Sequence, residues 1–308
     1  GNTLQNWEVL KGFEFWVVAD LWFTPTAGAA DIVLPPKHWL EVNCPRKSQG
    51  SSGAAGATCK CVEAPGECHW DPVIAINFFK AMGLPWANGT TDEEKWPGEE
   101  WVCNSIVKAR NGETWAEYKE NFQKNGWIDC KKDYPVWGTY RRYETGDMNQ
   151  GKQGWPTSTG KHEIWSVVME STYADGRYNV PTFIEPPQSK ANKPELYDDY
   201  PYTMTTGRRI PVYFHSEHRQ LPWCREQWMV PRVEINPNMA KRLGIEQGDW
   251  CWIETKFGKI RQMADLYYGI EDGVINCEHQ WWLPEIKAAG RGFELVCINC
   301  LVDPDAQD

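Results

Sequence analysis

The chain has 308 residues, a formal net charge of −10, 41% hydrophobic residues and 24% charged residues, which is typical of a globular protein large enough to hold two domains. The negative charge argues against nucleic acid and against an anionic membrane surface as partners. No stretch approaches the roughly 18 apolar residues of a membrane-spanning helix and no signal peptide is visible, so we expect a cytoplasmic protein, with export of the folded protein by the twin-arginine route as the alternative.

Residues 13–20 predict a short buried strand, because an apolar run ends there on an acid, Asp20. A helical turn is expected to begin at Thr24, and residues 32–35 predict a second brief strand. Strand, helix and strand make half of a doubly wound α/β unit, in which ligands lie beyond the carboxyl ends of the strands. Ala19 and Asp20 are therefore expected at the ligand edge, with a helix cap as the alternative role for Asp20.

Cysteines gather in the next part of the chain, where Cys44 is followed by Cys59, Cys61 and Cys68. Their spacing matches no common zinc or iron–sulfur pattern. We expect reduced thiols in a loop, with a metal site as the alternative. The eleven cysteines, an odd number, also argue against a complete disulfide framework. The nineteen tryptophans are expected mainly in the core and at interfaces.

A flexible loop is predicted over residues 46–57, which are rich in glycine and serine. The following helix is expected to run from Asp71 to Met82. In this interpretation Asp71 is the N-cap, Pro72 is the first helical residue and Gly83 ends the helix.

Residues 84–150 show no clean periodicity, apart from a helix expected over 114–123. Residues 154–173 predict extended structure. The proline-containing polar segment 186–199 predicts a linker. From Tyr200 onward short strands alternate with turns, which is the pattern that a small barrel requires.

Two blocks in this last region are the most informative part of the sequence. In residues 206–215 a turn centred on Gly207 is expected to open into a strand that ends on His215, and Arg208 adds a cation. Backbone N–H groups and a cation beside one ligand suit a large phosphorylated cofactor, with a plain hairpin as the alternative. Residues 231–249 predict a strand, a short helix and a Gly-Asp turn into another strand.

These motifs resemble the molybdopterin-dinucleotide oxidoreductases, the family of formate dehydrogenases, nitrate reductases, dimethyl sulfoxide reductase, acetylene hydratase and pyrogallol transhydroxylase. Residues 17–41, with Val-Val-Ala-Asp, Thr-Pro-Thr-Ala, Ala-Asp-Ile-Val-Leu-Pro and Trp-Leu-Glu, are similar to the third domain of that family. Residues 206–249 and the closing Asn-Cys-Leu at 299–301 are similar to its last domain. Val42, where many members have lysine, departs from the pattern.

The resemblance implies an α/β fold, in which a partial doubly wound α/β domain precedes a small six-stranded-type β-barrel. The α/β domain would span residues 1–185 with a divergent insert over 84–185, the linker 186–199, and the cofactor-binding barrel 200–308. The chain would then correspond to the C-terminal half of such an enzyme.

The same resemblance implies the residues that contact the cofactor. Asp20 would bind guanine or ribose, Arg208 phosphate or pterin, and Asn299 a pterin edge. For Asp71, nucleotide binding and N-capping remain alternatives of equal weight. The full predicted set is Asn2, Ala19, Asp20, Asp71, Thr206, Gly207, Arg208, Arg209, His215, Ser216, Arg291 and Asn299.

By this resemblance the chain is the pterin-dinucleotide-binding half or subunit of an oxidoreductase, dehydroxylase or hydratase that uses bis-molybdopterin guanine dinucleotide with molybdenum or tungsten. The metal ligand and a [4Fe-4S] cluster would lie in the N-terminal catalytic half, and an iron–sulfur electron-transfer subunit and a small-molecule substrate would be further partners. No catalytic residue is assigned, because His38, His218 and Trp223 each have more reason to be structural. The alternative function is a non-catalytic binding or assembly module on the same barrel.

Overall fold

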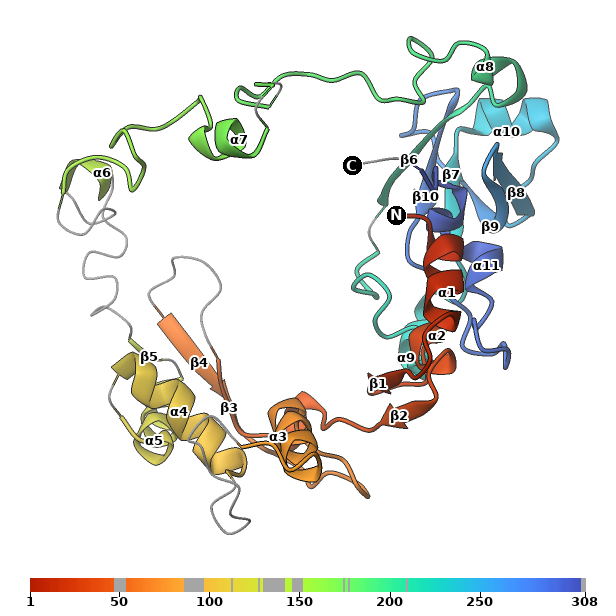
Figure 1. Ribbon diagram of the computed structural model, residues 1–308. Helices are drawn as coiled ribbons and strands as arrows, with labels where there is room; N and C mark the ends of the chain where they lie inside the picture. The colour runs from red at the N-terminus through yellow and green to blue at the C-terminus, as the bar shows by residue number, and fades with distance from the viewer. Residues whose placement is uncertain are drawn as a thin grey trace. The chain divides into compact units, whose positions relative to one another are not determined.

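The computed structural model describes residues 1–46, 54–85, 97–111, 113–126, 128–129, 142–145, 152–173, 175–176, 178–208 and 210–305 (Figure 1). The chain divides into two compact units. The first unit combines Gly1–Leu34 with Glu185–Asp308, and the second is Pro35–Ile184. This division groups the first 34 residues with the C-terminal region, whereas the sequence predicted one continuous domain over 1–185. No helix in the described ranges is long and apolar enough to cross a membrane.

The first unit is built on a five-stranded mixed sheet in the order β6-β10-β7-β9-β8. Parallel pairs join β6 to β10 and β7 to β9, and antiparallel pairs join β10 to β7 and β9 to β8. The strands are β6 (Thr203–Arg208), β7 (Arg232–Ile235), β8 (Trp250–Thr255), β9 (Gly258–Leu266) and β10 (Val274–Glu278).

The mixed α/β class is confirmed, but the sheet is a curled half-barrel and not the expected six-stranded barrel. Among the described residues five strands pair, which leaves β6 and β8 as the two edges. A largely apolar cavity of about 510 Å³ separates these edges and is lined by side chains of both, including Met204 and Ile253.

Helices close the core of this unit. Buried Val233, Ile260 and Ala264 of the sheet pack with Met239 of α10 and Phe293 of α11. Burying each of the larger of these side chains, such as Ile260 or Phe293, stabilises the fold by roughly 1.5–3 kcal/mol. The helices of the unit are α1 (Thr3–Lys11), α2 (Pro25–Gly28), α8 (Leu196–Asp199), α9 (Pro222–Gln227), α10 (Pro237–Leu243), α11 (Phe293–Val296) and the 3-10 helix η3 (Ile298–Leu301).

Both ends of the unit's chain meet in this core, where α1 lies beside α11 in Figure 1. The rings of Trp7 and Phe293 pack edge to face with centroids 5.2 Å apart. An edge-to-face aromatic pair of this kind adds about 0.5–1.5 kcal/mol beyond the buried area.

The predicted strand–helix–strand element is present as β1 (Val17–Ala19), α2 and β2 (Ile32–Leu34), and β1 and β2 pair in parallel. Thr24 is the N-cap of α2, since its hydroxyl accepts from the Ala27 N–H at 3.3 Å. The expected burial was wrong. Both strands are at most half-buried, because a two-stranded sheet and a four-residue helix leave one face uncovered.

The two informative blocks differ in outcome. Residues 231–249 form β7, α10 and the turn into β8 as predicted, with Asn236 as N-cap and Gly244 in the left-handed conformation. The predicted turn at Gly207 was wrong, because Gly207 lies inside β6. The strand ends before Pro211, which has no N–H to extend the ladder, and His215 has a left-handed backbone (φ 53°) that does not belong to a strand.

The second unit combines a three-stranded antiparallel sheet in the order β3-β4-β5 with helices. Its core contains Ile76, Val107, Trp115 and Tyr118. The strands are β3 (Cys44–Arg46), β4 (Ala54–Thr58) and β5 (Ile128–Asp129), and the helices are η1 (Trp39–Glu41), α3 (Asp71–Ala81), α4 (Glu99–Asn111), α5 (Trp115–Asn125), α6 (Arg142–Thr145) and α7 (Val167–Thr172).

Three local predictions for this unit and the linker need correction. Residues 54–58 of the predicted loop form β4, while 47–53 lie outside the described residues. Residues 154–173 consist of turns followed by α7, because Ser166 caps a helix there. The predicted linker includes helix α8 at its end. The helix expected over 114–123 is confirmed as α5, with Thr114 as N-cap in a capping box.

Candidate functional site

The pairing of β6 with β10 determines where the candidate site lies. Because the two strands are parallel, their carboxyl ends meet at the same edge of the sheet, where ligands of α/β proteins commonly bind. The register pairs Thr205 with Asn276 and Arg208 with Glu278. Two residues, Thr206 and Gly207, therefore oppose one residue of β10, which is a β-bulge. Bulges leave a backbone group unpaired and are common beside functional sites.

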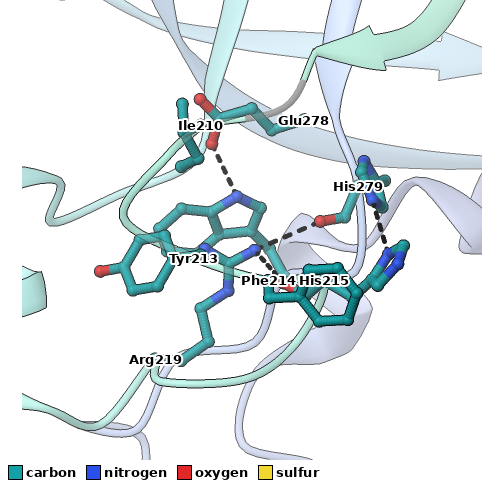
Figure 2. Close-up of a pocket in the computed structure, with 8 residues that line it drawn as sticks. Ile210, Tyr213, Phe214, His215, Arg219, Glu278 and His279 are labelled. Atoms are coloured by element: carbon teal, nitrogen blue, oxygen red, sulfur yellow. Dashed lines mark hydrogen bonds between the residues drawn. The ribbon is translucent and has the colours of Figure 1, made fainter. Parts of the chain in front are cut away.

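A small pocket opens just beyond these strand ends (Figure 2). Its volume of about 30 Å³ has room for roughly one or two water molecules. One wall comes from the segment after β6 and the other from the end of β10 and the residues that follow it. The lining residues are Ile210, Tyr213, Phe214, His215, Arg219, Glu278, His279 and Trp281.

Arg219 is the central cation of this pocket. Its guanidinium contacts the faces of two nearly perpendicular aromatic rings, with its central carbon 4.1 Å from the centre of Tyr213 and 3.8 Å from that of Trp281. Its Nη2 donates to the carbonyls of His215 at 2.8 Å and His279 at 3.4 Å. Burial lowers the pKa of Arg219 to about 10, and the nearby Glu278 carboxylate opposes that shift. The side chain therefore stays protonated at neutral pH.

Arg219 also keeps unused donors. The residue is 2% exposed, and its Nε and Nη1 have no hydrogen-bond partner among the described residues. Buried N–H groups without a partner are costly. They indicate that a water molecule or an acceptor group of a ligand completes this pocket.

Glu278 is held rigidly behind the arginine. Its two carboxylate oxygens accept from the indole Nε1 of Trp228 at 2.9 Å and of Trp281 at 2.7 Å. Gln262, fully buried, bonds the Glu278 backbone in both directions: Nε2 donates to the carbonyl at 2.8 Å, and Oε1 accepts from the N–H at 3.1 Å. Glu278 is therefore a fixed negative charge that balances Arg219.

Two histidines form the outer rim. The Nδ1 of His215 lies 3.2 Å from the Nε2 of His279, so one ring donates a hydrogen bond to the other (Figure 2). His215 has a positive φ, a backbone conformation that costs a non-glycine residue of order 1–3 kcal/mol and clusters at functional sites. The Arg219 bond to the His215 carbonyl helps to hold that conformation.

Gly207 leaves open space at the strand end. Its backbone φ is not in the left-handed range, and a Cβ built on it would meet no atom within 4 Å. The fold therefore does not require glycine here, although glycine weakens a strand by roughly 0.5–1 kcal/mol. Thr206 and Gly207 are both exposed. The side chain of Arg208 and all of Arg209 lie outside the described residues.

Ser216 and Arg291, also predicted from the sequence, each accept a hydrogen bond from one of two consecutive residues, Trp282 and Leu283. The Ser216 carbonyl accepts from Trp282 Nε1 at 3.4 Å, and the Arg291 carbonyl accepts from the Leu283 N–H at 2.7 Å. Arg291 has a φ of 49° and a buried Nε with no partner among the described residues. Its guanidinium carbon is 4.8 Å from the centre of the Phe23 ring.

That contact brings the β1 end close to Arg291. Gly28 packs so tightly on Ala289 that a Cβ would lie 2.2 Å from the Ala289 carbonyl oxygen. Asp20 follows β1, and its carboxylate accepts from the Trp22 N–H at 3.3 Å and the Thr24 hydroxyl at 2.8 Å. Ala19 is exposed beside it. Both residues lie at the carboxyl end of β1, as predicted.

The two predicted asparagines near the chain ends differ. Asn2 is 5% exposed and serves the fold, because its Oδ1 caps α1 at the Gln5 N–H (3.0 Å) and its Nδ2 donates to the Val302 carbonyl (2.8 Å). Asn299 is half-buried, and its side-chain amide makes no hydrogen bond within the part of the chain that the structure describes. It is therefore open to a ligand.

Asp71 belongs to the other compact unit, where it is exposed. Its predicted role as N-cap was wrong. Trp70 occupies the cap position without a side-chain hydrogen bond, and Asp71 is the first helical residue. An acid in the first turn still interacts favourably with the helix dipole.

The remaining candidates have structural surroundings. His38 caps η1 by accepting from the Leu40 N–H at 3.3 Å, whereas His218 and Trp223 are exposed. The thiols of Cys44 and Cys61 donate to backbone carbonyls. Among the described residues no group of three potential ligands surrounds a metal position.

Sequence reasoning missed Arg219, Glu278 and His279. Signals for them were present: Arg219 lies four residues after His215, and Glu278-His279 ends the apolar run of β10. It also missed Cys297 and Cys300, whose C-x-x-C spacing lies directly in the sequence.

The open groups of the first unit fit a ligand with phosphate groups and an amide-like ring edge. Arg219 and Arg291 retain buried cationic N–H donors, which suit phosphate or ring oxygens. Asn299 can donate and accept in one plane, as a pterin edge requires. Gly207 gives a backbone that a bulky ligand can approach closely.

Comparison with known proteins agrees with this chemistry. Residues 202–308 match the family model described as Molydopterin dinucleotide binding domain. Dopamine dehydroxylase of Eggerthella lenta is 46% identical over 358 aligned positions, which cover 100% of this chain and 35% of the relative. Acetylene hydratase of Syntrophotalea acetylenica is 27% identical over 269 positions, covering 87% of this chain and 33% of the relative.

The solved structure of acetylene hydratase from Pelobacter acetylenicus is similar to the whole chain. The TM-score is 0.79 at 25% sequence identity, with 99% of this chain and 39% of that chain covered. The chain thus spans about a third of the length of these relatives. It belongs to the molybdopterin-dinucleotide enzyme family, with the dinucleotide-binding domain in residues 202–308.

Proposed function

We propose that this chain is the dinucleotide-binding part of a molybdenum or tungsten enzyme that holds bis-molybdopterin guanine dinucleotide. The observation that carries the proposal is Gly207. It lies at a β-bulge at the carboxyl end of two parallel strands, in a backbone conformation that any residue can adopt, with open space where a side chain would be. A glycine that the fold does not need is explained by a ligand that approaches the backbone.

The surrounding residues supply the binding groups. Thr206, Gly207 and the following arginines Arg208 and Arg209 would bind the phosphates, with His215 and Ser216 at the next turn. Arg219 would hold this turn in place from behind, since it bonds the His215 carbonyl.

A second group of contacts would come from other elements of the same unit. Asp20 and Ala19 at the β1 end, together with Arg291 and Asn299, would bind the guanine, ribose or pterin portions, where Asp20 still has free lone pairs. Asn2 would contribute through the α1 turn that it caps. Asp71 remains a proposed nucleotide ligand from the other unit.

When bound, the metal of such a cofactor supplies the redox or Lewis-acid chemistry. The residues of this chain orient the dinucleotide, exclude water and place fixed hydrogen bonds around it. We propose that the metal ligand and an iron–sulfur cluster belong to the remaining two thirds of a longer enzyme, with an iron–sulfur subunit as electron-transfer partner.

For the reaction, we propose removal or addition of a hydroxyl group on a small molecule. The relative at 46% identity is named a dopamine dehydroxylase, and one at 27% an acetylene hydratase. The greater identity supports reductive dehydroxylation, in which two electrons and two protons replace a hydroxyl by hydrogen and release water.

The test is a pair of glycine variants in the full-length enzyme. Gly207→Val adds bulk at the proposed ligand surface, yet valine favours strands, so the unfolding midpoint should not fall. Guanine nucleotide released on denaturation, and molybdenum or tungsten content, should fall more than tenfold. Gly98→Ala, in similarly open space in the other compact unit, should retain both. Full nucleotide content in Gly207→Val would refute the proposal.

The alternative function, a non-catalytic assembly module, draws on exposed apolar side chains near the N-terminus: Phe13, Phe15 and Phe23 are 51%, 62% and 54% exposed. The same surface could instead contact the rest of a longer enzyme. Metal and nucleotide analysis of the native protein separates the two functions, because an assembly module contains neither.

A further inference from the structure

The cavity between the sheet edges β6 and β8 shares no lining residue with the pocket around Arg219. Its volume of about 510 Å³ falls within the roughly 300–1,000 Å³ of pockets that bind small molecules. Protein interiors contain few voids larger than a water molecule. A space of this size therefore needs a reason other than imperfect packing, and the chemistry of its lining indicates what it binds.

Core residues form the floor of this cavity. Val233, Ile235 and Ile253 of the sheet and Met239 of α10 line it, and each is at most 7% exposed. Apolar side chains that border an unfilled space lose the contacts that dense packing gives. A ligand with an apolar ring or chain restores these contacts and keeps water from the apolar floor.

The rim of the cavity is aromatic and acidic. Tyr202 and Trp252 line it and are 38% and 57% exposed, so both rings are accessible to a ligand that enters from solvent. Asp199 and Glu254 are exposed as well, and they are the only charged side chains among the described residues that line the cavity. Carboxylates and aromatic ring faces together attract a cation.

Neither carboxylate is saturated by the protein itself. Asp199 forms no ion pair within the described ranges. Glu254 has one cationic neighbour, Lys259, whose Nζ lies 3.8 Å from its Oε2, and both side chains are exposed. An exposed ion pair at this distance is weak. The same ammonium lies 4.7 Å from the ring centre of Trp252, so an amine is already the partner that this side of the rim selects.

We propose that this cavity binds a small organic amine, with its apolar ring or chain on the floor and its ammonium group at the rim. Asp199 and Glu254 supply the negative charge, and Tyr202 and Trp252 supply ring faces. The binding is noncovalent. It does not depend on the proposed cofactor, because no residue of the predicted dinucleotide set lines the cavity.

The test compares three probes that share one apolar body: phenylbutylamine, phenylbutanol and phenylbutyrate. Each is titrated calorimetrically into the full-length protein at neutral pH and low salt. The amine should bind with a dissociation constant of about 1 mM or lower. The alcohol should bind about three- to tenfold more weakly because it lacks the charge, and the carboxylate more weakly still. Added salt should reduce the preference for the amine, since both acids are exposed.

A pair of tryptophan variants locates the binding site. Met204→Trp adds bulk to a residue that lines the cavity and should weaken binding of the amine more than about tenfold. Met229→Trp is the matched control, because Met229 is 60% exposed and does not line the cavity, and it should bind as wild type does. Undiminished binding of the amine to folded Met204→Trp would overturn the proposal.

A pair of charge variants tests the choice of ligand. Asp199→Asn combined with Glu254→Gln should make amine and alcohol bind equally well. Glu246→Gln combined with Glu271→Gln removes the same charge from exposed acids outside the cavity and should keep the preference. All four acids are exposed, so these variants decide the result even if Met204→Trp does not fold. No saturable binding of the amine to wild type, or equal binding of amine and carboxylate, would overturn the proposal.

Discussion

The guanidinium of Arg219 is stacked on Trp281, with its central carbon 3.8 Å from the ring centre, and it shares that indole with Glu278, which accepts from Trp281 Nε1 at 2.7 Å. One aromatic side chain therefore contacts both buried charges of the pocket. The two charges are close enough to balance each other, and both also contact the same indole ring. Each is also fixed by an aromatic group that cannot move without disturbing the other.

This arrangement predicts that Arg219→Lys lowers the free energy of unfolding by about 2 kcal/mol. Lysine keeps the charge but loses the planar group that contacts both aromatic rings and donates to two carbonyls. Urea unfolding followed by tryptophan fluorescence measures the effect. Arg242→Lys is the control, because Arg242 is an exposed partner of Asp272 and should change stability by less than about 1 kcal/mol. Equal effects of the two substitutions would contradict this account.

The two predicted asparagines should separate folding from binding. Asn2→Ala removes a helix cap and the bond to Val302, and should cost about 1–2 kcal/mol of stability. Asn299→Ala removes no described side-chain hydrogen bond and should change stability by less than about 0.5 kcal/mol. If Asn299 binds the pterin, that variant should instead lose bound nucleotide. Urea unfolding and nucleotide content of both variants decide this, and a stability loss in Asn299→Ala equal to that in Asn2→Ala would count against it.

The contact between Gly28 and Ala289 should tolerate no side chain. In Gly28→Ala the new methyl would lie 2.2 Å from a backbone oxygen and 2.9 Å from a backbone carbon, so the two segments must separate. We expect a loss of about 1–3 kcal/mol and weaker binding at the nearby Asp20 and Arg291. Gly207→Ala, which meets open space, is the matched control and should keep wild-type stability. Thermal unfolding that is unchanged in Gly28→Ala would show that this contact is not tight.

Local patterns predicted much of the fold. The β1–α2–β2 element and the order of β7, α10 and β8 follow from turn residues and caps that act within a few positions. The position of β6 was misjudged because Gly207 resembles a turn residue. The structural role of Gly207 depends on the pairing of β6 with β10, which is about seventy positions away, and no local pattern predicts that register.

The site was predictable only in part for the same reason. Thr206, Gly207 and His215 belong to one contiguous motif. Arg219, Glu278 and Trp281 become a unit only when the segments after β6 and β10 meet. Asn2 was assigned to the ligand by resemblance, and the structure adds its role as a helix cap. The partners of a buried charge come from segments that are distant in the sequence, so its role cannot be predicted from local patterns.

The Cys297 thiolate should make stability depend on pH. Its pKa lies below the ordinary value of 9.0, at about 7, so the folded protein binds fewer protons than the unfolded chain between these values. This contribution is present above pH 9 and is lost as the pH falls through 7. Cys300 has a raised pKa and opposes the effect only above pH 9, where its unfolded thiol ionises.

The measurement compares urea unfolding of wild type and Cys297→Ser under reducing conditions across this pH range. Subtracting the two curves removes the other thiols, including Cys277 and Cys103, whose raised pKa values affect both proteins equally. The stability difference in favour of wild type should grow by about 2 kcal/mol from pH 7 to 9. A difference that stays constant over the range would mean that Cys297 remains a neutral thiol, held by packing alone.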